Sequence, residues 1–508
     1  MKLNYKRTIF VGFAFFLICA FWQAYDNTIP LILTNKFGLP QTASGIIMAL
    51  DNILALFMLP LFGMISDRCT SRLGRRTPFI LVGTIAAAIL LVCLSFVDNY
   101  QLRAVQEVAV PDDPAALSVI YQTQSEKELM TPEGERFVLS ERYTQDEFCA
   151  IRSDGEGDAY TQFVVPARQA YARETTRSAP GALIVFILVL LLLLISMAIF
   201  RTPAVALMPD VTVKPLRSKA NAVINLMGSA GGILILVLGM VFATSATKNA
   251  MMSYTTYFMV IAGVMLVALA IFLWKVREPK LVRQMPEDSR RCGLEDEGED
   301  ERTHRRLSRG ERRSLIFLLA SIVLWFMGYN AVTSKYSVYA SNILNKDYNL
   351  TLIIAQAAAI VAYLPVGMLS SKLGRKKTII AGVVMLTSAF TVACFLREDS
   401  PSMLMNAMFA LAGIGWATIN VNSFPMVVEM CSGGDVGRFT GIYYTASMAA
   451  QTVTPMFSGF LMDQFGMTVL FPYAAVFSGL AIVTMAFVLH GDNKPRSKRG
   501  LEALNVED

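Results

Sequence analysis

The chain has 508 residues, of which 54% are hydrophobic and only 17% are charged, whereas soluble domains carry about a quarter charged residues. Its charges lie in short clusters between apolar runs of roughly 20 residues, the length that crosses the hydrocarbon core of a bilayer. This pattern argues against a soluble protein. It also argues against nucleic-acid binding as the reason for the net charge of +6, because the basic residues flank apolar runs. We expect an all-α membrane protein.

Twelve apolar segments are long enough to be transmembrane helices, the form in which backbone groups pair within one segment in lipid. The first segment is too long for the apolar core of a signal peptide, so we expect it to be retained. The predicted spans are 8–34, 41–65, 78–98, 181–208, 219–243, 253–274, 314–340, 350–370, 378–396, 402–428, 437–460 and 468–490. Because their number is even, both termini should lie on one side of the membrane.

The charges of the short loops predict which side that is. One set of loops carries thirteen Lys and Arg residues near the spans, and the opposite set carries four. The positive-inside rule assigns the richer set, and both termini with it, to the cytoplasm. We therefore expect a multi-pass protein of the plasma (inner) membrane. The seven cysteines have no metal-type spacing, and only Cys149 is predicted to lie outside the membrane on the external side, so we expect no disulfide framework.

Two hydrophilic segments interrupt the spans. Residues 99–180 carry fourteen Asp and Glu against eight Lys and Arg, and should face outward. They form either a passive solvated loop or a small ordered cap that captures substrate or binds a partner, with short strands in RFVLSERY and YTQFVVPARQ. The predicted regions are 1–98 (spans 1–3), 99–180 (insertion), 181–274 (spans 4–6), 275–313 (flexible cytoplasmic linker), 314–490 (six-span half) and 491–508 (cytoplasmic tail).

An internal repeat relates the two halves of the chain. After the second span, residues 73–76 read LGRR, and after the eighth span residues 373–376 read LGRK. Internal repeats of this kind are typical of secondary transporters. The repeat also aligns Asp51 with Gln356, since each lies nine residues before a proline in its span. One half thus has an acid where the other has a neutral amide.

Asp51 is the first candidate for a proton-coupling group. It lies about 15 Å along its span, near the bilayer midplane, where a carboxylate costs about 2.5–3.5 kcal/mol. Burial favours the neutral carboxyl and water favours the ionised one, so one side chain can load a proton on one side and release it on the other. The alternative is a hydrogen bond that only packs two helices. Asp26 is the second candidate; it binds substrate hydroxyls, shares the proton, or is bathed by an external vestibule.

Aromatic and polar side chains within the spans suggest a substrate site. The first and seventh spans each carry a Trp, a Tyr and a polar residue close together, and sugars suit such sites because their rings stack on aromatics while their hydroxyls need polar partners. The alternative for each residue is a helix–helix hydrogen bond. The candidates are Trp22, Tyr25, Asp26, Asn27, Asn225, Tyr329, Asn330, Gln356, Trp416, Asn420, Tyr443 and Gln451.

Charged residues at the predicted cytoplasmic ends of the spans suggest a gate. Ion pairs there can hold the inner side closed in one state and break in the other; the alternative is charge that only sets topology. The candidates are Asp67, Arg75, Arg76, Arg201, Asp210, Arg217, Glu429 and Arg438. Lys335, near the outer end of the seventh span, is expected to extend its ammonium group to the membrane surface.

The segment SDRCTSRLGRRTPFI, residues 66–80, resembles the loop between helices 2 and 3 of sucrose transporters in the major facilitator superfamily. The wider resemblance is to glycoside–pentoside–hexuronide:cation symporters, with further similar segments at 201–210, 217–225 and 437–444. It covers nearly all of the membrane part but not 99–180. It implies two six-helix halves, alternating access and sugar uptake coupled to protons. Sodium-coupled members of this family carry paired acids in the second span, whereas the second span of this chain has only one acid, Asp51. Members that couple sugar to protons commonly carry an acid in the fourth span, but the fourth span of this chain is apolar.

We therefore expect a monomeric symporter that imports a sugar or glycoside with a proton and contacts membrane lipids. No nucleophile elbow, phosphate loop or metal cluster is visible in the sequence, so we expect no enzymatic activity, no cofactor and no metal. Two alternatives stay open. One is a proton-coupled exporter of amphipathic compounds on the same fold, and the other is a solute sensor that uses the insertion.

Overall fold

The computed structural model describes residues 4–153, 158–212, 217–291, 308–430 and 436–490. In these ranges a long helix follows each predicted span, as the need to satisfy backbone groups in lipid requires. The helices are α1 (Tyr5–Asn35), α2 (Gln41–Asp67), α3 (Thr77–Ala104), α8 (Gly181–Val211), α9 (Arg217–Val241), α10 (Thr255–Lys275), α12 (Arg309–Tyr339), α13 (Tyr348–Leu373), α14 (Arg375–Ala393), α15 (Ser402–Glu429), α16 (Val436–Phe465) and α17 (Leu470–Ala486).

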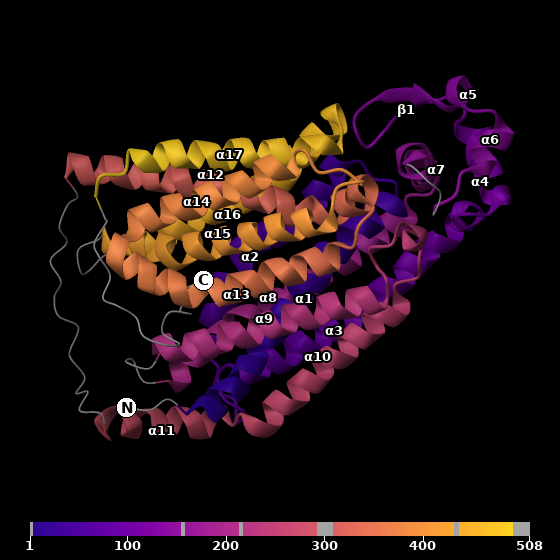
Figure 1. Cartoon of the computed structure of the whole chain (residues 1–508). Helices are drawn as coiled ribbons and strands as arrows, with labels where there is room; N and C mark the ends of the chain where they lie inside the picture. The colour runs from indigo at the N-terminus through magenta and orange to yellow at the C-terminus, as the bar shows by residue number, and fades with distance from the viewer. Residues whose placement is uncertain (1–3, 154–157, 213–216, 292–307, 431–435, 491–508) are drawn as a thin grey trace.

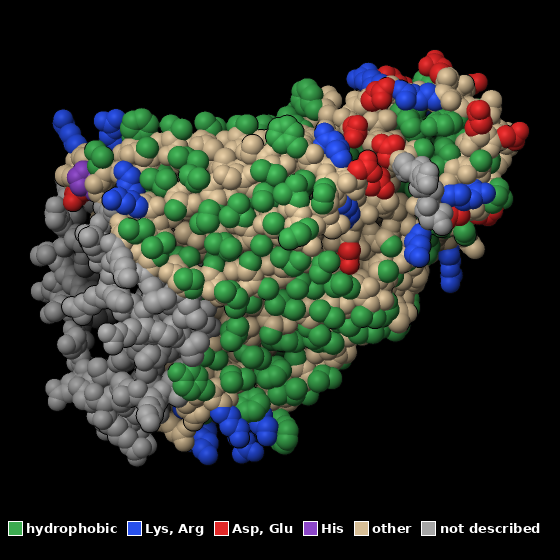
Figure 2. All heavy atoms as spheres, viewed as in Figure 1, with side chains coloured by type: hydrophobic (Ala, Val, Ile, Leu, Met, Phe, Trp, Pro, Cys, Tyr) green, Lys and Arg blue, Asp and Glu red, His purple; other side chains and the backbone are tan. Residues whose placement is uncertain are grey.

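The surface of the bundle has the character of a membrane protein. Among the described residues, ten helices are long and apolar enough to cross a membrane; α13 and α16 are not among them, and α13 has a shorter apolar stretch, Tyr348–Tyr363. Figure 2 shows hydrophobic side chains spread over the flank of the bundle, with charged side chains gathered towards its ends. Such a broad exposed apolar belt is unusual for a soluble monomer and fits contact with lipid.

The helices form two bundles, each with its own hydrophobic core. We call α1, α2, α3, α8, α9 and α10 the N half, and α12 to α17 the C half. In the N half α1 packs on α9 and α3 on α8, whereas in the C half α14 packs on α15 and α12 on α17. The halves meet where α2 packs on α16, α1 on α12 and α9 on α13. The predicted fold of two six-helix halves is confirmed.

The insertion after α3 is a folded unit, which we call the cap. It packs its own hydrophobic core, to which Leu117, Phe137 and Phe148 contribute. The strand predicted in RFVLSERY is present at Arg136–Val138. The prediction of a strand in YTQFVVPARQ, residues 160–169, was wrong, because this segment is helical. The cap consists of η1 (Gln106–Val108), α4 (Pro114–Gln124), β1 (Glu128–Met130), β2 (Arg136–Val138), α5 (Leu139–Arg142), α6 (Gln145–Ala150), η2 (Tyr160–Val164) and α7 (Val165–Ser178). The strands pair antiparallel, with Leu129 opposite Phe137.

The cap defines the two ends of the bundle. Figure 1 shows it at the end opposite the one where α1 begins. We call these the insertion end and the terminal end. At the terminal end, the helix α11 (Glu278–Arg291) occupies the first part of the predicted flexible linker and packs against α8. Residues 292–307 of that linker, and the predicted tail at 491–508, lie outside the described residues.

A buried ion pair joins three helices of the N half near the insertion end. Lys36 follows α1 directly, and its Nζ lies 2.6 Å from Oδ2 of Asp98 in α3. Both side chains have 0% exposure. The same Nζ lies 4.6 Å from the ring centroid of Tyr254, the residue before α10. Removing one partner of such a pair leaves the other charge buried without compensation.

We expect Asp98→Asn to lower the free energy of unfolding by about 3–5 kcal/mol, because Lys36 then keeps a buried charge with no counterion. Glu128→Gln is the matched control, since it breaks an ion pair with Arg136 whose side chains are 61% and 73% exposed, and should cost less than about 1 kcal/mol. Thermal unfolding of the purified protein in detergent measures both variants. Equal shifts in the unfolding midpoint for the two would contradict the structural role of the buried pair.

Candidate functional site

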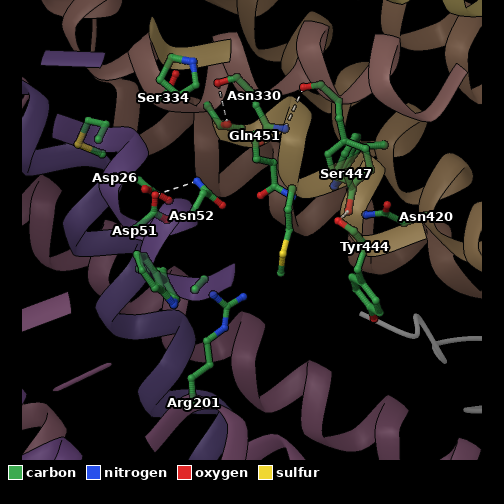
Figure 3. Close-up of a pocket in the computed structure, with 18 of the residues that line it drawn as sticks. Asp26, Asp51, Asn52, Arg201, Asn330, Ser334, Asn420, Tyr444, Ser447 and Gln451 are labelled. Atoms are coloured by element: carbon green, nitrogen blue, oxygen red, sulfur yellow. Dashed lines mark hydrogen bonds between the residues drawn. The ribbon is translucent and has the colours of Figure 1, made fainter. Parts of the chain in front are cut away.

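A cavity of about 400 Å³ lies between the two halves. Helices α1, α2 and α8 form one wall, and α12, α15 and α16 form the other (Figure 3). The N-half wall consists of Trp22, Asp26, Met48, Asp51, Asn52, Ala55 and Arg201. The C-half wall consists of Phe326, Asn330, Thr333, Ser334, Trp416, Asn420, Tyr443, Tyr444, Ser447, Met448, Gln451 and Pro455.

The N-half wall carries the charge of the cavity. Oδ1 of Asp51 accepts a hydrogen bond of 2.7 Å from Nδ2 of Asn52. The guanidinium of Arg201 lies 5.5 Å from the ring of Trp22 and close enough to Asp26 and Asp51 to interact with both charges (Figure 3). Two carboxylates and one guanidinium leave one negative charge uncompensated when both acids are ionised. One bound proton would make these three groups neutral as a set.

The C-half wall is uncharged over its described lining residues, and it combines aromatic rings with amides and hydroxyls. The ring of Trp416 stacks on that of Tyr329, with centroids 3.6 Å apart and planes 3° apart. The edge of Phe326 lies against Trp416 at 5.2 Å. This wall therefore offers a rigid apolar face beside several hydrogen-bonding groups, an arrangement suited to a neutral polar ligand.

Five predicted substrate residues lie outside the cavity wall. Gln356 donates a hydrogen bond of 2.6 Å to Oε1 of Gln23 in the other half, and Asn27 donates one of 2.8 Å to the carbonyl of Gln23. Tyr25 is buried against Trp22, with ring centroids 5.4 Å apart. The other two are Tyr329, which stacks on Trp416, and Asn225 in α9.

Several lining residues escaped the sequence analysis, and helical spacing is the signal that would have found some of them. Ser334 lies four residues after Asn330, which was predicted, so both are on one face of α12. Ser447 lies four residues before Gln451 in α16 by the same rule. Asn52 directly follows Asp51, and no pattern distinguishes it from an ordinary polar residue in a helix.

Polar contacts join the two halves at the insertion end. The carboxylate of Asp463 in α16 accepts hydrogen bonds of 2.7 Å from the backbone N–H groups of Gln41 and Thr42, at the first turn of α2. An acid at a helix N-terminus satisfies free N–H groups and interacts favourably with the helix dipole. Lys335 has 0% exposure, and its Nζ donates to the carbonyl of Gln41 at 2.8 Å. The expectation that Lys335 reaches the membrane surface was therefore wrong.

Further hydrogen bonds join the halves on the same side of the cavity. Oγ of Ser245 donates to Asp347 at 2.8 Å, and Oγ1 of Thr247 donates to Asn345 at 2.6 Å. Between described residues, the hydrogen bonds across the interface run from the middle of the bundle to the insertion end. The halves are thus held together at the insertion end.

The predicted gating residues form a cluster within the N half at the terminal end. The guanidinium of Arg76 contacts Asp67 at 2.5 Å and Asp210 at 2.9 Å, and Arg75 lies 3.6 Å from Asp210. The carboxylate of Glu278 in α11, which the sequence analysis missed, accepts from the backbone N–H groups of Arg75 and Arg76 at 2.7 and 3.0 Å. These contacts join α2, α3, α8 and α11, all on the N-half side.

The other predicted gating residues are placed differently or lie beyond what is described. Arg201 lines the cavity instead of joining the terminal-end cluster. The side chains of Arg217, Glu429 and Arg438 lie outside the described residues. Within the described residues there is no group of three or more metal-type side chains.

Several solved structures resemble the chain in fold, and several curated proteins resemble it over short sequence segments. The xylose transporter XylE from E. coli, in an inward open conformation, is 15% identical with a TM-score of 0.59 over 99% of both chains. A D-xylose-proton symporter is 16% identical with a TM-score of 0.56, over 95% of this chain and 97% of the other. At these identities the likeness concerns the fold alone.

Two curated proteins share short segments with the chain. Proton-associated sugar transporter A of Homo sapiens is 37% identical over 84 residues, which are 16% of this chain and 11% of the relative. Sucrose transport protein SUC4 of Arabidopsis thaliana is 42% identical over 55 residues, 11% of each chain. The matched segments thus span about a tenth of the length of either relative.

The family comparison covers most of the chain. The model described as Major Facilitator Superfamily matches residues 11–129, 175–357 and 344–504. This match confirms the resemblance drawn from residues 66–80, and with it the expectation of a membrane transporter and not an enzyme. The chain belongs to the major facilitator superfamily.

Proposed function

We propose that the chain imports a sugar or glycoside together with a proton, as a monomer, by alternating access of the central cavity. This proposal rests on the difference in charge between the two cavity walls. Two acids and one arginine lie on the N-half wall, whereas the described C-half wall carries no charge and consists mainly of amides, hydroxyls and aromatic rings.

The charged wall supplies a reason for coupling to protons. With Asp26 and Asp51 both ionised, Arg201 compensates one negative charge and leaves the other in a site of low dielectric. A proton taken from the side to which the cavity is open removes that charge. A closed state buries whatever net charge the cavity carries, and burying a net charge costs free energy. The halves would therefore change state most readily when the proton is bound and the cavity is neutral.

The groups on the uncharged C-half wall are suited to binding a sugar. The stacked pair of Trp416 and Tyr329 presents a flat ring on which an apolar sugar face can lie. Asn330, Asn420 and Gln451 supply amide donors and acceptors for hydroxyl groups. The cavity volume of about 400 Å³ falls within the range of small-molecule sites, about 300–1,000 Å³.

The proposal also states which end of the bundle faces the cytoplasm and that the sugar moves inward. The positive-inside rule assigns the terminal end and both termini to the cytoplasm, so the cap would face outward in the plasma membrane. The contacts at the insertion end would then describe a state closed to the outside. The named relatives, proton-associated sugar transporter A and sucrose transport protein SUC4, support a sugar as the substrate.

Asp51→Asn should abolish proton-driven accumulation of sugar in proteoliposomes while sparing exchange of labelled for unlabelled sugar, because exchange requires no net proton movement. Asp26→Asn tests the second acid in the same assay. We expect the larger loss for Asp51, whose carboxylate faces the cavity and accepts a hydrogen bond from Asn52. Accumulation at the normal level in both single variants and in the double variant would contradict proton coupling through this wall.

Trp416→Leu should raise the half-saturating sugar concentration about tenfold, because an aromatic contact contributes about 1.5 kcal/mol and 1.4 kcal/mol is a tenfold change. Trp274→Leu is the matched control, since Trp274 is 73% exposed at the end of α10 and does not line the cavity. Uptake over a sugar concentration series measures both variants. A normal half-saturating concentration for Trp416→Leu would mean that sugar does not bind at this face. Efflux of amphipathic dyes in place of sugar uptake would favour the exporter.

A further inference from the structure

The cap is one packed unit attached to the N half. Its chain continues from α3 and leads into α8, and α7 lies along the insertion end of α1. Nε of Arg173 donates to the carbonyl of Gly38 at 2.9 Å, and Nε2 of Gln169 donates to Oδ1 of Asn35 at 2.9 Å. Because the hydrophobic core of the cap also includes Met251, in the loop before α10 of the N half, the cap is expected to move with the N half as a body.

The far side of the cap is attached to the C half. In the turn between β1 and β2, the carbonyl of Pro132 accepts a hydrogen bond of 2.6 Å from the backbone N–H of Met467, which lies between α16 and α17. The carboxylate of Glu133 lies 3.9 Å from Nε of Arg397, in the loop after α14. The cap therefore bridges the two halves over the insertion end.

The contact between the turn and the α16–α17 loop is made by closely apposed backbones. Gly134 and Gly466 both have positive φ, +98° and +88°. A Cβ at Gly134 would lie 2.4 Å from the carbonyl oxygen of Phe465, and one at Gly466 would lie 2.4 Å from the nitrogen of Gly134. A side chain at either position is incompatible with this approach, so the docking depends on two glycines facing each other.

The same end of α16 is therefore held twice. Asp463 contacts the first turn of α2, and Phe465 to Met467, only a few residues further on, contact the cap. If the halves separate at the insertion end, α16 must leave both α2 and the cap turn, because the cap stays with the N half. The inner contact joins the halves at the insertion end, and the outer contact lowers the free energy of that closed arrangement further.

We infer that the cap is a strap that stabilises the closed insertion end, and that its contact with Phe465–Met467 breaks whenever the cavity opens there. This inference rests on the proposed alternating access, but it concerns a contact and not a substrate. It can therefore be tested by access to the cavity, without any transport of sugar.

A disulfide placed across the contact tests the strap directly. The double variant P132C/M467C, in a Cys149→Ser background, links the cap turn to the C half. The matched control E128C/V138C links two directly opposed strand residues within the cap and leaves the interface alone. Each is combined with S334C, which places a thiol in the cavity wall. A membrane-impermeant maleimide is added from the insertion side, and labelling at position 334 is measured by mass spectrometry.

With P132C/M467C oxidised, we expect labelling of position 334 from the insertion side to fall roughly five- to tenfold and to recover on reduction; the oxidised control should label like the unlinked protein. Unchanged labelling in the oxidised strap variant would overturn the inference. So would failure of this pair to form a disulfide, because the contact would then not be populated. Sugar uptake by the unlinked protein is measured in parallel, so that a failure of the proposed function is seen separately.

A loosening variant gives the opposite change. Gly134→Ala should raise insertion-side labelling of S334C about fivefold, the effect of losing roughly one net hydrogen bond from the closed state. Gly181→Ala is its control, because a Cβ there meets nothing within 4 Å. If both alanine variants label alike, the turn does not restrain the halves and the strap is contradicted.

Discussion

When Asp26 and Asp51 are both ionised, one negative charge stays uncompensated in the cavity between the two helical bundles, and the proposed coupling to protons depends on it. Asp26, Asp51 and Arg201 lie together on the N-half wall, and the described residues of the opposite wall offer no balancing charge. In a site surrounded by apolar helices, a lone charge is expensive. Binding one proton neutralises this charge. The neutral amides and aromatic rings of the C-half wall are suited to an uncharged substrate.

The polar contacts that join the halves lie on one side of the cavity, in the part of the chain that the structure describes. Asp463 and Lys335 join the halves at the first turn of α2, and the cap adds a second attachment beyond them. At the terminal end, the cluster around Arg76 ties together helices of the N half alone. The polar contacts between described residues are thus asymmetric about the cavity, as a state closed at the insertion end requires.

The fold and the acid wall were largely predictable from sequence, because both follow from local or repeated patterns. Apolar length predicts the spans, and the repeat singles out Asp51. The role of Asp463 was not predictable, because it depends on meeting the start of α2, 421 and 422 positions away along the chain. Lys335 was misassigned for a related reason, since its partner Gln41 belongs to the other half. The cap looked like a solvated loop because its apolar residues are spaced too irregularly to reveal a core.

The most direct test of the central claim is the movement of protons when sugar is added to weakly buffered proteoliposomes that contain the protein. With no imposed gradient, we expect external pH to rise as sugar enters, in a fixed ratio to the labelled sugar taken up. The rise should be absent when Asp26 and Asp51 are both replaced by Asn. Sugar entry without any change in external pH, or an unchanged pH response in that double variant, would show that Asp26 and Asp51 do not couple sugar entry to protons.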